Sequence, residues 1–204
     1  MAQEEYTPDG PLAREIAANL PYFPYKKIDR FYDIGGLLKQ PALFDKACEA
    51  LAARYRGQQI DAIGAFDARG FLFTPVAIKL GVPLFMLRKG GKMPNAISGK
   101  GYTTEYDSKD GLNIQRDAIK PNDRVLLIDD LIATGGTLCA GIELVHALGG
   151  TVVECACLVE LKALGGDAKV KAAGGHGCWA LVSESVLTVP GQLVEGYVDD
   201  GEGH

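Results

Sequence analysis

The sequence predicts an α/β fold in which a mostly parallel central sheet is flanked by helices. Short apolar runs typical of buried strands alternate with helical patterns along the 204 residues. Some of these apolar runs end in charged residues beside glycine. The clearest such run, within residues 125–137, leads directly into a helical pattern. We find no repeat and no linker, so residues 1–204 are expected to form one domain.

The first half of the chain supplies the outer elements of this fold. Pro11 precedes a short amphipathic helix, an irregular aromatic arm follows, and Pro41 can open a longer helix because its missing N–H is not needed there. A buried strand, a helix and a second strand come next. The expected ranges are helix 12–20, arm 26–36, helix 41–56, strand 60–66, helix ending at 80 and strand 82–87.

The second half contains a polar region and then the central strand. Residues 93–101 are rich in loop formers and are expected to form a mobile loop, and residues 102–106 and 112–115 look like a hairpin. The remaining elements are expected at strand 125–128, helix 136–148, strand 151–159 and strand 178–182. The acidic tail, about residues 189–204, is expected to be loosely held.

Composition excludes several functional classes. The net charge of -5 argues against a nucleic-acid partner bound by bulk electrostatics. No apolar run reaches the roughly 18 residues that span a bilayer, and the N-terminus lacks a signal pattern, so we expect no membrane partner and a cytoplasmic location. The five cysteines come without a CxxC motif and are expected to be reduced, buried thiols rather than zinc ligands.

The stretch VLLIDDLIATGGT, residues 125–137, carries the clearest chemistry. Its glycines let the backbone approach a ligand, and the loop N–H groups with the helix dipole favour an anion such as phosphate. The paired acids would repel phosphate but accept hydrogen bonds from ribose hydroxyls. Ligands of open α/β sheets bind at this carboxyl edge. The candidate sugar-phosphate residues are Asp129, Asp130, Ala133, Thr134, Gly135, Gly136 and Thr137.

The segment DDLIATGGT resembles the phosphoribosyl-diphosphate (PRPP) motif of type I phosphoribosyltransferases, in particular the adenine phosphoribosyltransferases. A generic phosphate-binding turn is the alternative. The resemblance implies the type I fold with an N-terminal hood, about residues 1–36, and a mobile catalytic loop. It also implies purine salvage, in which PRPP and adenine give AMP and diphosphate. Mg²⁺ held mainly by PRPP and water, without direct protein ligands, and a homodimer are implied as well.

A second anion site is expected at Asp67, Ala68, Arg69 and Gly70, which follow a predicted strand. Arg69 offers a planar fork of donors and Gly70 leaves room for close approach. An ordinary turn with a surface arginine is the alternative. The tetrapeptide resembles the diphosphate loop of the same family, which implies a non-proline cis peptide at Asp67–Ala68 and a catalytic contribution from Arg69.

The other basic cluster follows the next strand and consists of Arg88, Lys89 and Lys92. A solvated loop is the alternative, but a diphosphate leaving group needs neutralising. The resemblance covers these positions, implies a catalytic role for Arg88, and adds Tyr106 to the diphosphate contacts.

Proton chemistry is assigned to Glu105, which the resemblance places in the catalytic loop, facing an imidazole-ring nitrogen of adenine. The base gives up a ring proton as it joins ribose, and an acid/base group can manage that charge. An exposed strand glutamate is the alternative. In six-oxo-purine transferases an aspartate usually stands where this chain has Ala133, so that role must fall elsewhere.

The expected adenine contacts are Arg30, Phe31 and Leu161. By resemblance, Phe31 stacks on the purine, backbone groups near Arg30 read its edge, and Leu161 closes the other face. Core packing is the alternative for Phe31 and Leu161. Two rival functions remain: transfer to a six-oxo purine or pyrimidine, and a non-enzymatic regulator that senses PRPP.

Overall fold

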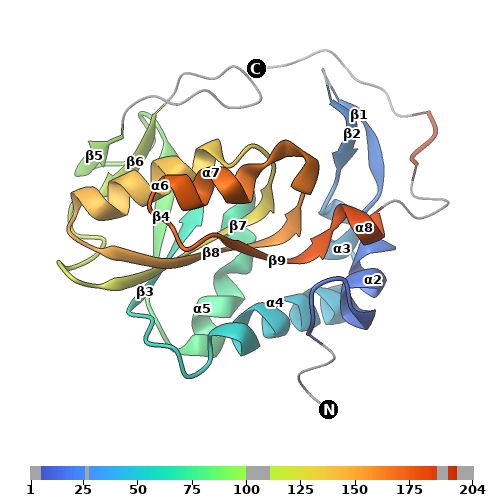
Figure 1. Cartoon of the computed structure of the whole chain (residues 1–204), viewed down its shortest axis with the longest axis horizontal. Helices are drawn as coiled ribbons and strands as arrows, with labels where there is room; N and C mark the ends of the chain where they lie inside the picture. Colours follow the sequence, from blue (N-terminus) through green and yellow to red (C-terminus); the bar gives the residue numbers. More distant parts are fainter. Residues whose placement is uncertain (1–5, 26–27, 100–110, 188–192, 197–204) are drawn as a thin grey trace.

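The computed structural model describes residues 6–25, 28–99, 111–187 and 193–196. In these ranges a seven-stranded sheet has the order β5-β6-β4-β3-β7-β8-β9, and β1 and β2 form a separate two-stranded sheet (Figure 1). The strands are β1 (Tyr22–Tyr25), β2 (Ile28–Tyr32), β3 (Ala62–Phe66), β4 (Leu84–Lys89), β5 (Ala96–Ser98), β6 (Leu112–Gln115), β7 (Arg124–Ile132), β8 (Thr151–Glu160) and β9 (Cys178–Ser183).

The central strands are parallel, as predicted. β3 pairs in parallel with β4 and β7, β7 pairs with β8, and β8 pairs with β9. β6 and β5 extend one edge in antiparallel pairing. Every residue of β3 is buried, as is typical of a strand covered on both faces.

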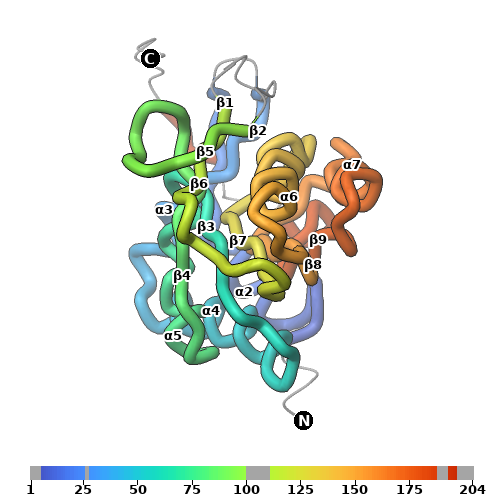
Figure 2. The backbone as a smooth tube through the Cα atoms, turned by 90° about the vertical axis from the view of Figure 1, so that its left-hand side faces the viewer, coloured from blue at the N-terminus to red at the C-terminus, as the bar shows by residue number. Residues whose placement is uncertain are grey.

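Helices cover both faces of the sheet. Figures 1 and 2 place α6 and α7 on one face and α4 and α5 on the other. The helices and 3₁₀ turns are α2 (Pro11–Ala17), α3 (Gly35–Leu38), α4 (Pro41–Tyr55), η1 (Arg69–Phe73), α5 (Thr74–Leu80), α6 (Gly136–Ala147), η2 (Lys162–Leu164), α7 (Gly166–Ala172) and α8 (Glu184–Leu187). α4 begins at Pro41, as predicted from the fit of proline to the first helical position. α2 spans Pro11–Ala17, whereas a helix was expected over residues 12–20, after Pro11.

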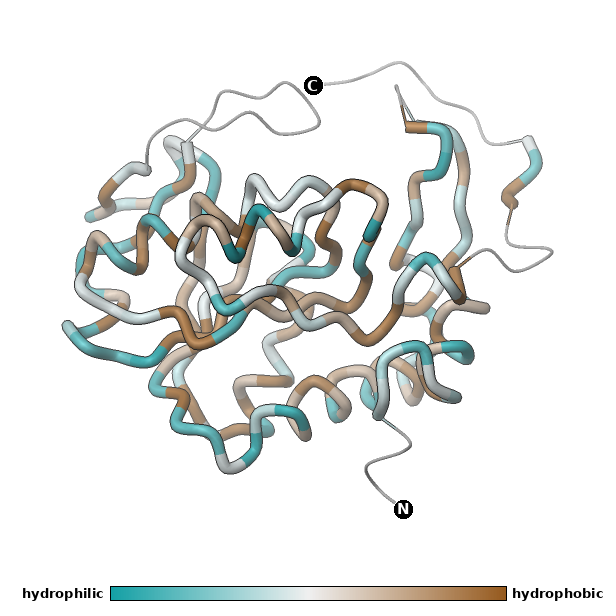
Figure 3. The backbone as a smooth tube through the Cα atoms, in the orientation of Figure 1, coloured by the Kyte–Doolittle hydropathy of each residue, from teal (hydrophilic) through white to brown (hydrophobic). Residues whose placement is uncertain are grey.

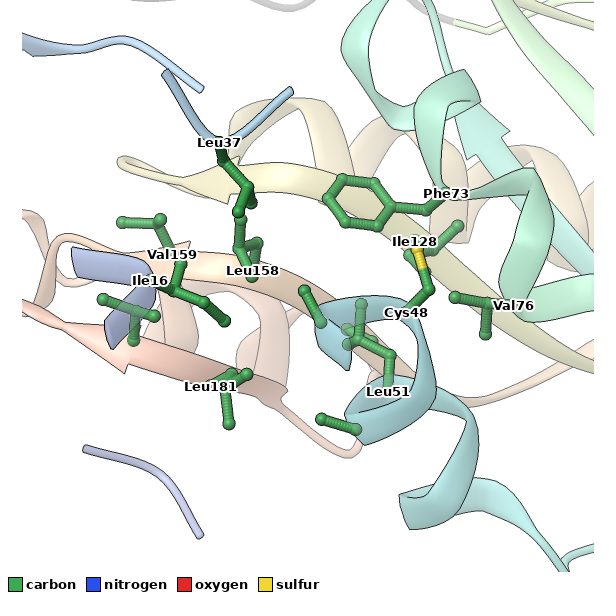
Figure 4. Close-up of a cluster of buried hydrophobic side chains, with 14 of the residues drawn as sticks. Ile16, Leu37, Cys48, Leu51, Phe73, Val76, Ile128, Leu158, Val159 and Leu181 are labelled. Carbon is green, nitrogen blue, oxygen red and sulfur yellow. The ribbon is translucent and has the colours of Figure 1, made fainter. Parts of the chain in front are cut away.

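The two faces bury separate apolar cores. Leu126 and Ile128 of β7 belong to the core beneath α4 and α5, whereas Val125 and Leu127 belong to the core beneath α6. Figure 4 shows Ile128 in the first of these cores. This division follows from the two-residue period of a strand. Hydrophobic residues follow the sheet strands, and several exposed turns between elements are hydrophilic (Figure 3).

The polar region after β4 differs from the sequence prediction. Residues 93–101 were expected to form a loop, but they contain β5, where Ile97 pairs with Ile114 and packs against the α6 core. β6 pairs with β4 and with β5, and the expected hairpin partner, residues 102–106, lies outside the described residues. β4 also extends through Arg88 and Lys89, which lie on the strand rather than after it.

The cysteines are free thiols, as predicted, although Cys139 and Cys178 are only partly buried. Part of the C-terminal tail contacts the two-stranded sheet: Leu193 bridges to Tyr22, and the Val194 N–H donates to the Tyr22 carbonyl at 3.1 Å. None of the described helices is long and apolar enough to cross a membrane.

Candidate active site

A cavity of about 310 Å³ lies at the carboxyl ends of β3 and β7, beside β2 and the start of η2. The structure brings most of the predicted site residues into its lining. Those residues are Arg30, Phe31, Asp67, Ala68, Arg69, Lys89, Asp129, Asp130, Ala133, Thr137 and Leu161. A continuous sheet edge therefore collects residues from distant parts of the chain, as expected for an open α/β fold.

The acid pair lies on β7. The Asp130 N–H donates to Asp129 Oδ1 at 2.9 Å. Asp130 is only 4% exposed, and its Oδ2 lies 2.8 Å from Arg69 Nε in an ion pair that lacks hydrogen-bond alignment. Burial raises the pKa of both carboxyls; repulsion from Asp130 adds to the rise at Asp129, and Arg69 opposes it at Asp130. The pair thus has unused acceptor capacity that suits hydroxyl donors or a hydrated cation.

The turn after β3 packs closely against this pair. A Cβ atom at Gly70 would lie 2.9 Å from the Ile128 carbonyl oxygen and 3.0 Å from Asp129 Oδ1. Only glycine therefore lets η1 approach β7 so closely at this point. The Asp67–Ala68 peptide is cis, as the family resemblance implied.

The glycine turn between β7 and α6 is held by its backbone conformation. Gly135 has φ +77° and precedes the first residue of α6, and its carbonyl accepts the Cys139 N–H at 3.0 Å. A Cβ atom at Gly135 would lie 2.7 Å from the Gly166 carbonyl oxygen. Ala133 and Thr137 line the cavity, whereas Thr134, Gly135 and Gly136 complete the turn beside it.

The basic cluster surrounds an acid. Arg88 Nε lies 3.3 Å and Lys92 Nζ lies 3.8 Å from Oδ2 of Asp67, whose side chain is mostly buried. Arg88 Nη1 also donates to the Lys92 carbonyl at 3.2 Å. Lys89 is exposed and lines the cavity. An incoming anion must therefore compete with Asp67 for Arg88 and Lys92.

The two-stranded sheet supplies an aromatic wall. The Phe31 ring stacks on Phe23 with centroids 5.6 Å apart, and the Arg30 guanidinium carbon lies 5.9 Å from the Tyr22 ring centroid. The Arg69 guanidinium carbon lies 5.2 Å from the Phe31 centroid. Arg69 therefore contacts both the aromatic wall and the acid pair.

Some lining residues were not among the adenine contacts expected from the sequence. Tyr32 and Leu164 line the cavity, the first beside Phe31 and the second three residues after Leu161. In the sequence they could be found only by their proximity to predicted residues, since neither side chain type points to a particular chemistry.

Glu105 and Tyr106 lie outside the described residues. Among the residues that are described, no group of three or more His, Cys, Asp or Glu side chains is placed to hold a metal ion.

Known proteins resemble this chain over most of its length. Residues 34–173 match the phosphoribosyl transferase domain family. The adenine phosphoribosyltransferase of Edwardsiella ictaluri is 46% identical over 154 residues, which are 75% of this chain and 83% of that protein. The enzyme of the same name from Shewanella baltica is 42% identical over 164 residues, 80% of this chain and 88% of that protein.

Solved structures agree with the sequence relatives. Adenine phosphoribosyl transferase from Trypanosoma brucei, crystallised with AMP, pyrophosphate and ribose-5-phosphate, has a TM-score of 0.81, 34% identity and coverage of 88% of this chain and 82% of that one. The Thermoanaerobacter pseudethanolicus adenine phosphoribosyltransferase has a TM-score of 0.78, 39% identity and coverage of 84% and 99%. Together with the cavity, these matches show that the chain belongs to the phosphoribosyltransferase family, on its adenine phosphoribosyltransferase branch.

Proposed function

We propose that this protein transfers the 5-phosphoribosyl group of PRPP to adenine, forming AMP and releasing diphosphate in purine salvage. The observation that carries the proposal is that one cavity joins the acid pair and glycine turn to the Phe31 wall. The first part suits a ribose phosphate and the second suits a flat base, so the two reactants would meet between them.

The β7 side binds the ribose phosphate in this proposal. Asp129 and Asp130 accept hydrogen bonds from the ribose hydroxyls and stabilise the positive charge that grows on the sugar as diphosphate departs. The loop from Ala133 to Thr137 binds the 5-phosphate through backbone N–H groups and threonine hydroxyls. This remote contact supplies binding energy that holds the reacting carbon in place.

The β3 and β4 ends bind diphosphate. Arg69, Arg88, Lys89 and Lys92 would neutralise the departing anion, while Asp67 holds Arg88 and Lys92 until the anion arrives. The Ala68 backbone N–H and Tyr106 complete these contacts. The hard carboxylate oxygens beside this site fit a hydrated Mg²⁺ carried mainly by PRPP, which would supply further positive charge to the leaving group.

The base side binds adenine. Phe31 stacks on the ring, Leu161 covers the other face, and backbone groups near Arg30 read the base edge. The bond from the ribose carbon to diphosphate breaks as the bond to the purine nitrogen forms, and Glu105 takes up the proton that this imidazole ring gives up. Because Arg69 lies over Phe31 in this structure, adenine stacking on that face requires Arg69 to move toward the diphosphate.

The proposed assembly is a homodimer. Ile78 of α5 is 75% exposed and Met86 of β4 is 40% exposed. Met86 alternates with Phe85 and Leu87 of the α6 core, so it lies on the sheet face that α5 covers. A second subunit could cover these apolar side chains. Sedimentation of the wild type and of Ile78→Lys tests this, and a monomeric wild type would contradict it.

The free cysteines support placing this enzyme in the reducing cytoplasm.

The deciding experiment measures nucleotide formation from PRPP and Mg²⁺ with adenine, hypoxanthine, guanine and orotate in parallel. We expect AMP from adenine and no product from the other bases. Turnover with another base would overturn the roles of Phe31, Glu105 and Ala133. PRPP binding without any turnover would favour a regulator.

A further inference from the structure

A polar corner joins the segment before α2 to the end of β9 and the start of α8. Asp9, just before α2, accepts hydrogen bonds from the Ser183 N–H at 2.8 Å, the Ser183 hydroxyl at 2.6 Å and the Ser185 hydroxyl at 2.8 Å. Its own N–H donates to the Leu181 carbonyl at 2.9 Å. These contacts fix the end of β9 and the start of α8 against the N-terminal segment.

Glu184 lies between these serines and reaches the turn that borders the cavity. Its Oε2 accepts the Ala163 N–H at 3.0 Å. Ala163 is the middle residue of η2, and the flanking residues Leu161 and Leu164 both line the cavity. The backbone of residues 183–185 therefore connects the hydrogen bonds of Asp9 to the hydrogen bond between Glu184 and the cavity wall.

The η2 turn has one further side-chain contact with this corner, since Lys162 Nζ lies 4.0 Å from Asp9 Oδ2 at the first residue of the turn. It is a short 3₁₀ turn, a conformation with weak hydrogen-bond geometry, and it ends at Gly165 with φ +69°. Leu164 is 51% exposed, so packing restrains it poorly. The Leu161 N–H donates to the Ile132 carbonyl at 2.9 Å, which anchors only the start of the turn. The contact from Glu184 is thus the side-chain restraint at its centre.

We propose that Glu184 is a positioning residue for the base side of the cavity, fixing Leu161 and Leu164 through Ala163, and that Asp9 holds Glu184 in place. The inference rests on the proposed function, because it assigns η2 to adenine binding. Glu184 touches neither reactant. Its loss should weaken binding of the purine while leaving the β7 sugar-phosphate loop unchanged.

Steady-state kinetics of Glu184→Ala test this with adenine and PRPP varied separately. One lost hydrogen bond of ordinary strength should raise KM for adenine by about three- to tenfold, with kcat and KM for PRPP within about twofold of wild type. Glu184→Gln should restore KM, because its amide oxygen can accept the same Ala163 N–H. Asp9→Asn should shift KM for adenine in the same direction by a smaller factor.

The matched control is Glu15→Ala, which removes an exposed carboxylate that lies 3.7 Å from Lys46 and not beside η2. Hydrogen exchange of the Ala163 amide gives a readout independent of turnover, and it should be faster in Glu184→Ala than in Glu15→Ala. An unchanged amide rate, an unchanged KM for adenine, or equal losses for both substrates would overturn the inference. A wild type that makes no AMP from adenine would instead overturn the proposed function, and the assignment of η2 to adenine with it.

Discussion

The two sides of the cavity are built differently. The side that we propose binds the sugar phosphate is one continuous segment, residues 125–137, whose strand pairs with β3 and β8 along both edges. The side that we propose binds the base combines the two-stranded sheet with η2, which are distant in sequence and more exposed. The first side owes its geometry to the sheet, and the second owes it to individual side-chain contacts such as Glu184 to Ala163.

Arg69 connects the two sides. It lies 2.8 Å from Asp130 Oδ2 and stacks over Phe31 at 5.2 Å. In this structure it shields a buried negative charge and covers the aromatic face at once. We therefore expect substitutions on one side of the cavity to change the kinetics of either PRPP or adenine, whereas substitutions of Arg69 should change the kinetics of both substrates.

The largest effect is expected at Asp130. Asp130→Asn removes a buried negative charge that would stabilise the cationic sugar, so kcat/KM for PRPP should fall by about 10²–10³. Initial rates at varied PRPP measure this. Asp61→Asn is the control, since Asp61 accepts the Arg124 N–H at the opposite end of the sheet. If activity stays within about tenfold of wild type, the negative charge of Asp130 does not stabilise the cationic sugar.

Phe31 tests the base side alone. Phe31→Ala removes a stacking surface that contributes about 1–3 kcal/mol, so KM for adenine should rise by about five- to a hundredfold. KM for PRPP should change much less than KM for adenine, since Phe31 reaches the expected PRPP site only through Arg69, which lies over its ring. Phe31→Tyr keeps the ring and should retain a KM for adenine near that of wild type. A larger rise in KM for PRPP than for adenine would contradict the division into two sides.

Gly135 and Gly165 can be compared by the effect of a Gly→Ala substitution at each position on the free energy of unfolding. Both have positive φ, but a Cβ atom at Gly135 would lie 2.7 Å from the Gly166 carbonyl oxygen, whereas nothing lies within 4 Å of one at Gly165. Gly165→Ala should lower the free energy of unfolding by about 1 kcal/mol and Gly135→Ala by about 2–3 kcal/mol. Urea unfolding measures both. Equal losses would show that the glycine turn relaxes around the added methyl group.

The same contrast explains what the sequence could predict. The acid pair and glycine turn were recognisable because their residues are consecutive and their order follows the strand, turn and helix. β5 was missed because its three residues gain their pairing partner only in the folded sheet. The contact of Asp9 with Ser183 joins residues 174 positions apart and has no local signature. Likewise, the stacking of Arg69 on Phe31 depends on how the two-stranded sheet is placed.

The smallest predicted effect concerns pH and the Asp9 corner. Burial alone would raise the pKa of Asp9, but hydrogen bonds from Ser183 and Ser185 outweigh it and hold the pKa below its ordinary value. A lowered folded-state pKa stabilises the fold above the unfolded value of about 3.9, and this contribution disappears as the pH falls through the folded value. The difference in unfolding free energy between wild type and Asp9→Asn should therefore be constant from neutral pH to about pH 5 and shrink below about pH 4. Urea unfolding of both proteins across this range measures it. A difference that grows on acidification would mean that the serine hydroxyls do not favour the charged carboxylate, and would remove the support we assign to α8.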